Sequence, residues 1–142
     1  MGRSRGGLTT KINALVDAEG RPVDLKLTAV QAHDGKAAAS LLQSVSAYDI
    51  LLADKAYDSM EIRQLVEEQG AWANIPARKN RKEAFAFSGF LYRYRNQVER
   101  FFGKIKQFRG IATRYDRKPE NYMAALKLAS LRIWLKSYES AA

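Results

Sequence analysis

Two neighbouring runs near the start of the chain have the residue patterns of strands. The run from Leu8 to Val16 is rich in residues that favour strands, and in the run from Val23 to Val30 the apolar residues take every second position. Turn-forming residues fill the interval between them, which begins with Asp17. The pattern predicts an antiparallel hairpin with one buried face, and it gives Asp17 a role in the turn.

Further along, apolar spacings typical of helices alternate with short apolar runs typical of strands. The expected helices cover residues 36–45, 58–69, 91–109 and 119–138, and the expected strands cover 48–53 and 72–75. Gly70 is the expected stop of helix 58–69, and Pro119 is the expected start of the last helix. This order predicts a mixed α/β or α+β fold, and we expect a single domain over residues 1–142.

Two aspartates lie close to one strand end. The run 48–53 is of the kind found in strands buried inside α/β sheets, and Asp54 follows it directly. A carboxylate at that end of a strand lies where open α/β sheets bind ligands, although an ordinary strand-end cap explains it equally well. Asp58, with Ser59 and Glu61 behind it, has the spacing of a capping box and is expected to be structural.

The expected helix 91–109 has three faces when its residues are placed about 100° apart. The apolar face is expected to lie against the core, and it consists of Leu91, Tyr94, Val98, Phe101, Ile105 and Phe108. The opposite face is polar and solvated. Tyr92, Arg95, Glu99 and Lys106 lie on a narrower stripe at the border, where the wall of a cleft is expected. A surface ion pair between Glu99 and Arg95 is the simpler structural alternative.

Positive charge is concentrated in one segment. The net charge is +9, and residues 78–118 alone contain 13 Lys or Arg against three acidic residues. Such a segment binds nucleic acid, binds acidic lipid or keeps a protein in solution, and the aromatic residues between the basic ones favour nucleic acid. The chain has no cysteine and no apolar stretch near the ~18–20 residues of a membrane span. We therefore expect a cytoplasmic protein without a membrane partner.

Asp54 and Glu99 are the candidate metal ligands. Their carboxylate oxygens suit Mg²⁺ or Mn²⁺, whereas a chain with one histidine and no cysteine is a poor candidate for zinc. The single histidine, His33, is expected to make local hydrogen bonds rather than to act as a general base.

The spaced set Tyr92-x2-Arg95-x3-Glu99-x6-Lys106 resembles the glutamate-region signature of the DDE transposases of insertion sequences. Residues 53–58, Ala-Asp-Lys-Ala-Tyr-Asp, are similar to the second-aspartate region of the same family. Residues 2–11 resemble the run that opens the second strand of that family. The resemblance therefore covers nearly the whole chain.

This resemblance implies a ribonuclease H-like fold, a mixed sheet flanked by helices, in which two aspartates and a glutamate hold two Mg²⁺ or Mn²⁺ ions against the scissile phosphate. Asp54 would be the second aspartate and Glu99 the glutamate, both catalytic and metal-binding. The implied activity is cleavage and strand transfer at the ends of an insertion element, by a bacterial, nucleoid-associated homo-oligomer on transposon-end and target DNA. Accessory contacts to DNA are implied for Tyr92, Arg95 and Lys106. We expect Arg100 and Lys104 of the polar face to contact DNA as well.

The first aspartate of the family pattern has no counterpart here. In the family it lies on a central strand upstream of the run at residues 2–11, where this chain begins. We therefore expect a domain truncated at its N-terminus and inactive by itself, with the missing aspartate supplied by the product of an upstream reading frame. A decayed remnant of an element fits equally well.

Two other functions fit the same residues. One is a non-catalytic DNA-binding module that grips phosphates with the basic segment 78–118. The other is a nuclease or resolvase that uses the same carboxylates on other DNA structures.

Overall fold

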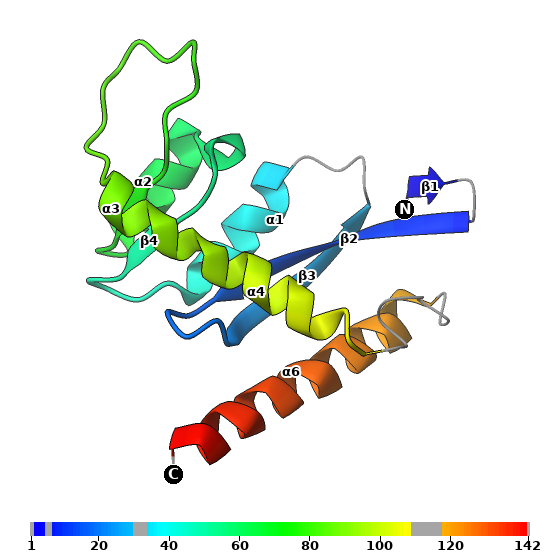
Figure 1. Cartoon of the computed structure of the whole chain (residues 1–142). Coiled ribbons are helices and arrows are strands. Elements are labelled where there is room, and N and C mark those ends of the chain that lie inside the picture. The colour runs from blue at the N-terminus through cyan, green and yellow to red at the C-terminus, as the bar shows by residue number, and fades with distance from the viewer. Residues whose placement is uncertain (1, 5–6, 30–33, 109–117, 142) are drawn as a thin grey trace. The chain divides into compact units, whose positions relative to one another are not determined.

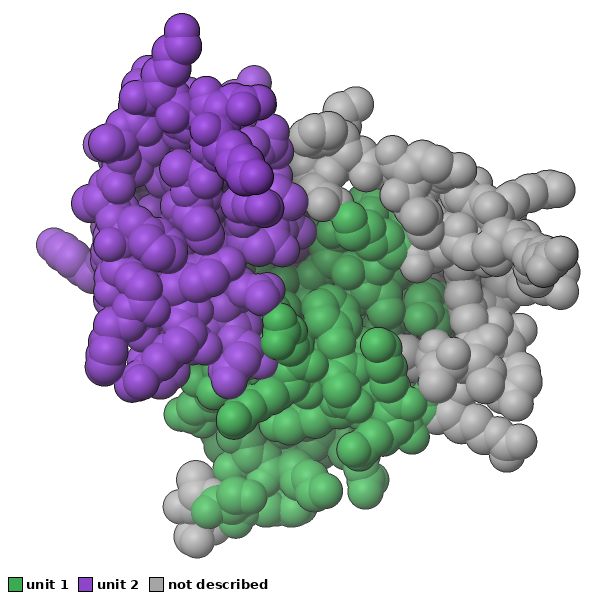
Figure 2. Space-filling model, turned by 45° about the horizontal axis from the view of Figure 1, so that its top comes forward, with its two compact units in different colours: residues 1–30, 97–142 green, residues 31–96 purple. Residues whose placement is uncertain are grey.

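The computed structural model describes residues 2–4, 7–29, 34–108 and 118–141, which form helices and short strands in mixed order (Figure 1). The chain divides into two compact units, coloured separately in Figure 2. Unit 1 comprises residues 1–30 and 97–142, and unit 2 comprises residues 31–96. Unit 1 contains an antiparallel sheet and unit 2 a parallel one, so the predicted mixture of α and β structure is confirmed.

Unit 1 is built on a three-stranded antiparallel sheet. Its strands, in spatial order, are β1 (Gly2–Ser4), β2 (Gly7–Val16) and β3 (Pro22–Ala29). β2 and β3 form the predicted hairpin, with Ile12 opposite Leu27 and Ala14 opposite Leu25. Because residues that lie opposite one another in an antiparallel pair point to the same face, these four apolar side chains share one face of the hairpin.

Asp17 organises the turn of this hairpin. Its Oδ1 accepts hydrogen bonds from the backbone N–H groups of Glu19 at 3.0 Å and Arg21 at 2.9 Å. Its Oδ2 pairs with the Arg21 Nε at 2.8 Å. Gly20 has φ +80°, a backbone conformation that glycine adopts without steric cost. The predicted role of Asp17 in the turn is therefore confirmed.

Two helices cover the apolar face of the hairpin. They are α4 (Asn96–Ile105) and α6 (Pro119–Ala141), the long helix in orange and red in Figure 1. The buried cluster consists of Phe101 and Ile105 from α4 with Tyr122, Leu126, Ala129 and Ile133 from α6. Ile12, Ala14, Leu25 and Leu27 pack against this cluster. The alternation over residues 23–30 therefore identified the buried face at Leu25 and Leu27, whereas Val23 on the same face is 48% exposed. The Trp134 Nε1 donates to the Pro22 carbonyl at 2.8 Å and ties α6 to the start of β3.

Unit 2 is built around a pair of parallel strands. β4 (Ile50–Leu52) pairs with β5 (Trp72–Asn74), and α2 (Met60–Glu68) connects them. α1 (Asp34–Leu41) precedes this unit of strand, helix and strand and continues into a 3₁₀ turn, η1 (Leu42–Ser44). The buried apolar residues of unit 2 are Ala37, Ala38, Leu41, Leu42, Val45, Ile62, Val66, Ala73 and Ile75. Gly70, with φ +77°, ends α2 as predicted.

The strand expected over residues 48–53 is shorter and more exposed than its apolar sequence suggested. Ile50 is 46% exposed, Leu51 and Leu52 are half-buried, and Tyr48 lies outside the strand with 95% of its surface exposed. In the described part of the chain β4 pairs only with β5, so one of its edges has no neighbouring strand. The prediction of a buried strand is therefore wrong.

The continuous helix expected over residues 91–109 is interrupted. α3 (Gly89–Tyr92) is followed by a 3₁₀ turn, η3 (Arg93–Arg95), and α4 then ends at Ile105. A 3₁₀ turn has about 3.0 residues per turn instead of 3.6, so residues on its two sides do not keep one helical phase. Tyr94, an expected member of the core face, is 47% exposed, whereas Phe101 and Ile105 are buried as predicted.

None of the helices in the described residues is both long enough and apolar enough to cross a membrane.

Candidate functional site

Asp54 lies where β4 has ended and a 3₁₀ turn, η2 (Lys55–Tyr57), begins. Its Oδ1 accepts a hydrogen bond from the Ala56 N–H at 3.0 Å, so the carboxylate caps this turn. The Tyr57 N–H donates to the Asp54 carbonyl at 3.0 Å. Among the residues that the structure describes, none donates to Oδ2 of this half-buried side chain. The strand-end cap is therefore present, and it leaves one carboxylate oxygen for a ligand.

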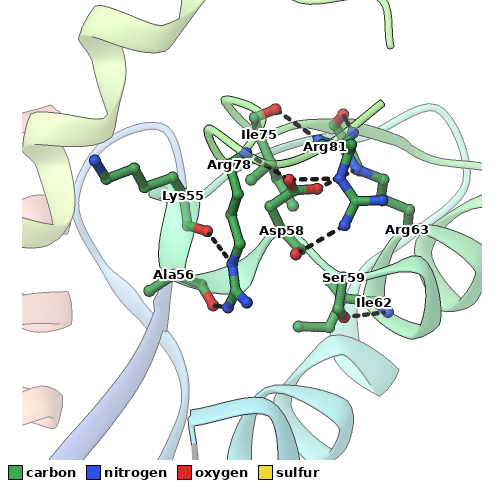
Figure 3. Close-up of polar contacts among 10 residues, drawn as sticks. Lys55, Ala56, Asp58, Ser59, Ile62, Arg63, Ile75, Arg78 and Arg81 are labelled. Carbon is green, nitrogen blue, oxygen red and sulfur yellow. Dashed lines mark hydrogen bonds and ion pairs between the residues drawn. The ribbon is translucent and has the colours of Figure 1, made fainter. Parts of the chain in front are cut away.

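Asp58 is not the N-cap that the capping-box spacing predicted. Ser59 caps α2 instead, because its Oγ accepts the Ile62 N–H at 3.1 Å. Asp58 is buried, and its carboxylate points into the protein. Its Oδ1 accepts from the Arg63 Nε at 2.8 Å, and its Oδ2 accepts from the Arg81 Nε at 2.7 Å (Figure 3). The backbone N–H of Arg78 also donates to Oδ2, at 2.7 Å. Asp58 thus links three arginines.

These donors hold the carboxyl of Asp58 in its charged form. Burial by itself would raise the pKa of Asp58, but the hydrogen bonds from the Arg78 N–H and from the side chains of Arg81 and Arg63 more than offset it. The net result is a pKa below the ordinary value of an aspartate. Asp58 is therefore an ionised group at neutral pH, with both of its oxygens occupied by donors.

Arg78 joins the same cluster to the turn that follows Asp54. Its Nε donates to the Lys55 carbonyl at 3.2 Å and its Nη2 donates to the Ala56 carbonyl at 2.8 Å, as Figure 3 shows. Arg63 extends the cluster to the end of β5, where its Nη2 donates to the Ile75 carbonyl at 2.8 Å. The loop that carries Asp54 is consequently held by side chains from α2 and from the basic loop between β5 and α3 (residues 75–88).

An aromatic ring covers part of this arginine cluster. The guanidinium carbon of Arg63 lies 4.1 Å from the centre of the Phe85 ring, and that of Arg81 lies 5.5 Å from it. Arginine over an aromatic face is favourable when the cation is shielded from water. Phe85 therefore contributes to the burial of the charges that surround Asp58.

Glu99 lies in the first turn of α4 and is exposed. Arg100 and Lys104 follow it on the same helix with exposed side chains, as expected for a polar face. Lys106 lies one residue beyond the end of α4, is exposed, and continues the helical hydrogen bonding through its N–H to the Phe102 carbonyl at 3.2 Å. These side chains all belong to unit 1.

Tyr92 and Arg95 lie in α3 and η3 of unit 2, and both are half-buried. The Arg95 guanidinium carbon lies 5.7 Å from the centre of the Tyr92 ring, and the Phe87 ring lies 5.4 Å from the same ring. Two of the four members of the expected border stripe are therefore adjacent to one another.

The seven candidate site residues are divided between the units. Asp54, Tyr92 and Arg95 belong to unit 2, whereas Glu99, Arg100, Lys104 and Lys106 belong to unit 1. Asp54 and Glu99 belong to different units, so their pairing at one metal site stays a prediction. Within the described ranges, no three His, Asp or Glu side chains gather as a metal site. Asp54 and Glu99 nevertheless offer the carboxylate oxygens that Mg²⁺ and Mn²⁺ prefer.

Sequence reasoning did not identify the arginines around Asp58. For Arg63 a signal was present, because it lies beside Ile62 and three residues before Val66 on the buried face of α2. A cation on an apolar helix face indicates a buried partner. Arg78 and Arg81 lie in a loop without periodicity, so no sequence pattern distinguishes them from the exposed lysines beside them. His33 and residues 109–117 of the basic segment lie outside the described residues.

The sequence of this chain is similar to a known protein family and to a known protein. The model of the family described as "Transposase DDE domain" matches residues 2–134. A Brucella ovis protein named "Putative transposase for insertion sequence element IS6501" is 35% identical over 130 residues, which are 91% of this chain and the whole of that relative. No solved structure matches. On the extent of the family match and the identity to this relative, the chain belongs to the transposase DDE domain family.

Proposed function

We propose that this chain is the catalytic region of an insertion-sequence transposase, which cleaves DNA at the ends of the element and transfers the strands with the help of divalent metal ions. The observation that carries the proposal is the match to the transposase DDE domain over residues 2–134, which includes both candidate carboxylates. A ribonuclease H-like fold is part of the proposal. The antiparallel hairpin covered by helices and the parallel strand pair support it.

Asp54 and Glu99 are the proposed metal ligands. The cap at Asp54 uses Oδ1 and leaves Oδ2 available, which suits a carboxylate that is held rigidly and still binds an ion. Glu99 is exposed near the start of α4, where a negative charge is favourable to the helix. The bound ions would supply stabilisation of the attacking and leaving oxygens during an in-line displacement at phosphorus.

The other candidate residues are proposed to hold DNA. Arg100, Lys104 and Lys106 are exposed and close in sequence to Glu99, so they suit contacts to phosphates beside the scissile bond. Arg95 can fork onto a phosphate while its guanidinium remains over the Tyr92 ring. In the basic loop, Lys79 and Lys82 are exposed and suit contacts to the backbone farther away.

The experiment is a cleavage assay on a labelled duplex that carries an element end, with Mn²⁺ or Mg²⁺ added or withheld. The chain is assayed alone and as a fusion to a proposed upstream reading-frame product, because the resemblance to the family implies a third carboxylate. Cleavage is expected to require metal and to fall by at least about 10³-fold in Asp54→Asn and in Glu99→Gln. Glu67→Gln removes a carboxylate from the exposed side of α2 and is expected to cut normally.

The alternative of a DNA-binding module without catalysis makes a different prediction. The exposed lysines and arginines would then give binding whose affinity falls steeply with salt, and Glu99→Gln would bind as well as the unchanged chain. If the chain and the fusion both bind DNA in this way, and neither cleaves it with Mg²⁺ or Mn²⁺, the non-catalytic module is favoured. Equal cleavage by the unchanged chain and by Glu99→Gln would show that the assigned metal ligand is wrong.

A further inference from the structure

Arg78 and Asp54 both form hydrogen bonds with Ala56 in the short turn η2. The Ala56 N–H donates to Asp54 Oδ1 at 3.0 Å. The Ala56 carbonyl accepts from the Arg78 Nη2 at 2.8 Å (Figure 3). The Arg78 Nε takes the preceding carbonyl, that of Lys55, at 3.2 Å. One guanidinium therefore fixes the orientation of two successive peptide groups, and one of these residues donates to the candidate metal ligand.

The backbone of Arg78 is itself held in place by Asp58. Its backbone N–H donates to Asp58 Oδ2 at 2.7 Å, and Asp58 is buried between Arg63 and Arg81. Removal of one partner from a buried ion pair is costly, so this anchor is expected to persist through thermal motion. Because the anchor uses the backbone of Arg78, a substitution of the Arg78 side chain leaves it in place. The contacts of the Arg78 side chain with the turn can thus be removed while the hydrogen bonds and ion pairs of Asp58 remain.

We infer that Arg78 is a positioning residue, which holds the turn over residues 54–58 in the conformation that presents the Asp54 carboxylate to metal. This inference rests on the proposed function, in which Asp54 is a metal ligand. A displacement of about 1 Å at a catalytic group lowers rates by roughly 100-fold. A turn that has lost its two carbonyl contacts to Arg78 is expected to permit displacements of that size.

A simpler role for Arg78 is a contact to a DNA phosphate. Its neighbour Lys79 provides the matched control, because it carries the same charge in the same loop, is exposed, and makes no hydrogen bond or ion pair with the residues that the structure describes. If Arg78 acts only through its charge, Arg78→Ala and Lys79→Ala will behave alike. If it positions the turn, the two variants will differ in readouts that do not depend on DNA affinity.

The first readout is hydrogen exchange of the metal-free, DNA-free chain. The Ala56, Tyr57 and Asp58 amides are all hydrogen-bonded within the turn. Arg78→Ala is expected to speed their exchange by at least about tenfold, and Lys79→Ala to leave it unchanged. Unchanged exchange in Arg78→Ala would overturn the inference, whatever the activity of that variant.

The second readout is the division of the kinetic effect in the cleavage assay. Arg78→Ala is expected to lower kcat by about 10–100-fold, and Lys79→Ala to raise KM alone. Arg78→Lys keeps the charge and one donor nitrogen, and it should recover part of kcat. Equal effects of Arg78→Ala and Lys79→Ala on kcat would overturn the positioning role. Faster exchange in Arg78→Ala, together with no cleavage by the unchanged chain either alone or as the fusion, would support the role of Arg78 in the turn and reject the proposed catalysis.

Discussion

Asp58 and Arg63 form an ion pair of 2.8 Å in which the two side chains are 0% and 8% exposed. A second arginine, Arg81, pairs with the other oxygen of Asp58 at 2.7 Å and is 16% exposed. These contacts join the turn after β4, the helix α2 and the loop after β5. The interior of unit 2 therefore contains a buried ionic cluster, and we expect the stability of the fold to depend on the pairing of the Asp58 carboxylate.

Replacement of Asp58 is expected to destabilise the protein strongly. Asp58→Ala leaves Arg63 buried without its carboxylate, and loss of one partner from a buried pair costs about 3–5 kcal/mol. Urea unfolding would measure the change in the free energy of unfolding. Glu67→Ala removes an exposed carboxylate from α2 and should change it by less than about 0.5 kcal/mol. A similar effect of both substitutions would contradict the buried cluster.

The same carboxylate is expected to make stability depend on acid. The pKa of Asp58 is lower in the folded protein than in the unfolded chain, where it is about 3.9. The unfolded chain therefore binds the proton first, and the stabilisation is complete above about pH 4 and declines as the pH falls below that value. Asp58→Asn lacks this carboxyl group. The difference in the free energy of unfolding between the unchanged protein and this variant should therefore become smaller below about pH 4. A deficit that is constant from pH 7 to pH 3 would show that the pKa of Asp58 is not lowered.

The antiparallel part of the fold was predictable because local pattern and final packing agree. Leu25 and Leu27 alternate with polar residues in the sequence and lie against the core in the structure. The break at residues 93–95 was not predictable, because the apolar spacing through Tyr94 fits an unbroken helix. The exposure of Ile50 was not predictable either, since an apolar run does not show how many strands will lie beside it.

Substitution of Gly70 is expected to test the end of α2. Its φ of +77° is costly for other residues, and an added Cβ would lie 3.3 Å from the Ala47 Cβ. Gly70→Ala should therefore lower the free energy of unfolding by about 1–2 kcal/mol. Gly89→Ala is the control, because an added Cβ there meets nothing within 4 Å. Equal tolerance of both changes in thermal unfolding would argue against the left-handed conformation at Gly70.

The core of unit 1 is expected to depend on Phe101. This side chain is fully buried between the hairpin and α6, and Phe→Ala substitutions in cores cost about 3–5 kcal/mol. Leu128→Ala, at a position 70% exposed on α6, should cost less than about 1 kcal/mol. Chemical denaturation of the two variants separates these expectations. A small loss for Phe101→Ala would mean that α4 does not pack as described.

The candidate site was predictable only where residues have a fixed spacing. Asp54 was identified from its place after a strand, and the structure adds the cap at Ala56 that spacing could not show. Asp58 was assigned to a capping box because Glu61 follows it at the right interval, whereas Ser59 takes that role. Two of its three arginine partners, Arg78 and Arg81, lie 20 and 23 residues away in a loop, and no local pattern reports contacts over such a distance.

The central claim is that Asp54 binds the catalytic metal ion, and a change of ligand type tests it most directly. The natural chain has no cysteine, so Asp54→Cys introduces one sulfur at one place. Sulfur binds Mn²⁺ better than it binds Mg²⁺, so cleavage by this variant should be lost with Mg²⁺ and recover by at least about tenfold with Mn²⁺. Asp49→Cys, at an exposed aspartate of the same unit, should cut equally with both ions. If Asp54→Cys cuts equally well, or equally poorly, with the two ions, Asp54 is not a ligand of the catalytic metal.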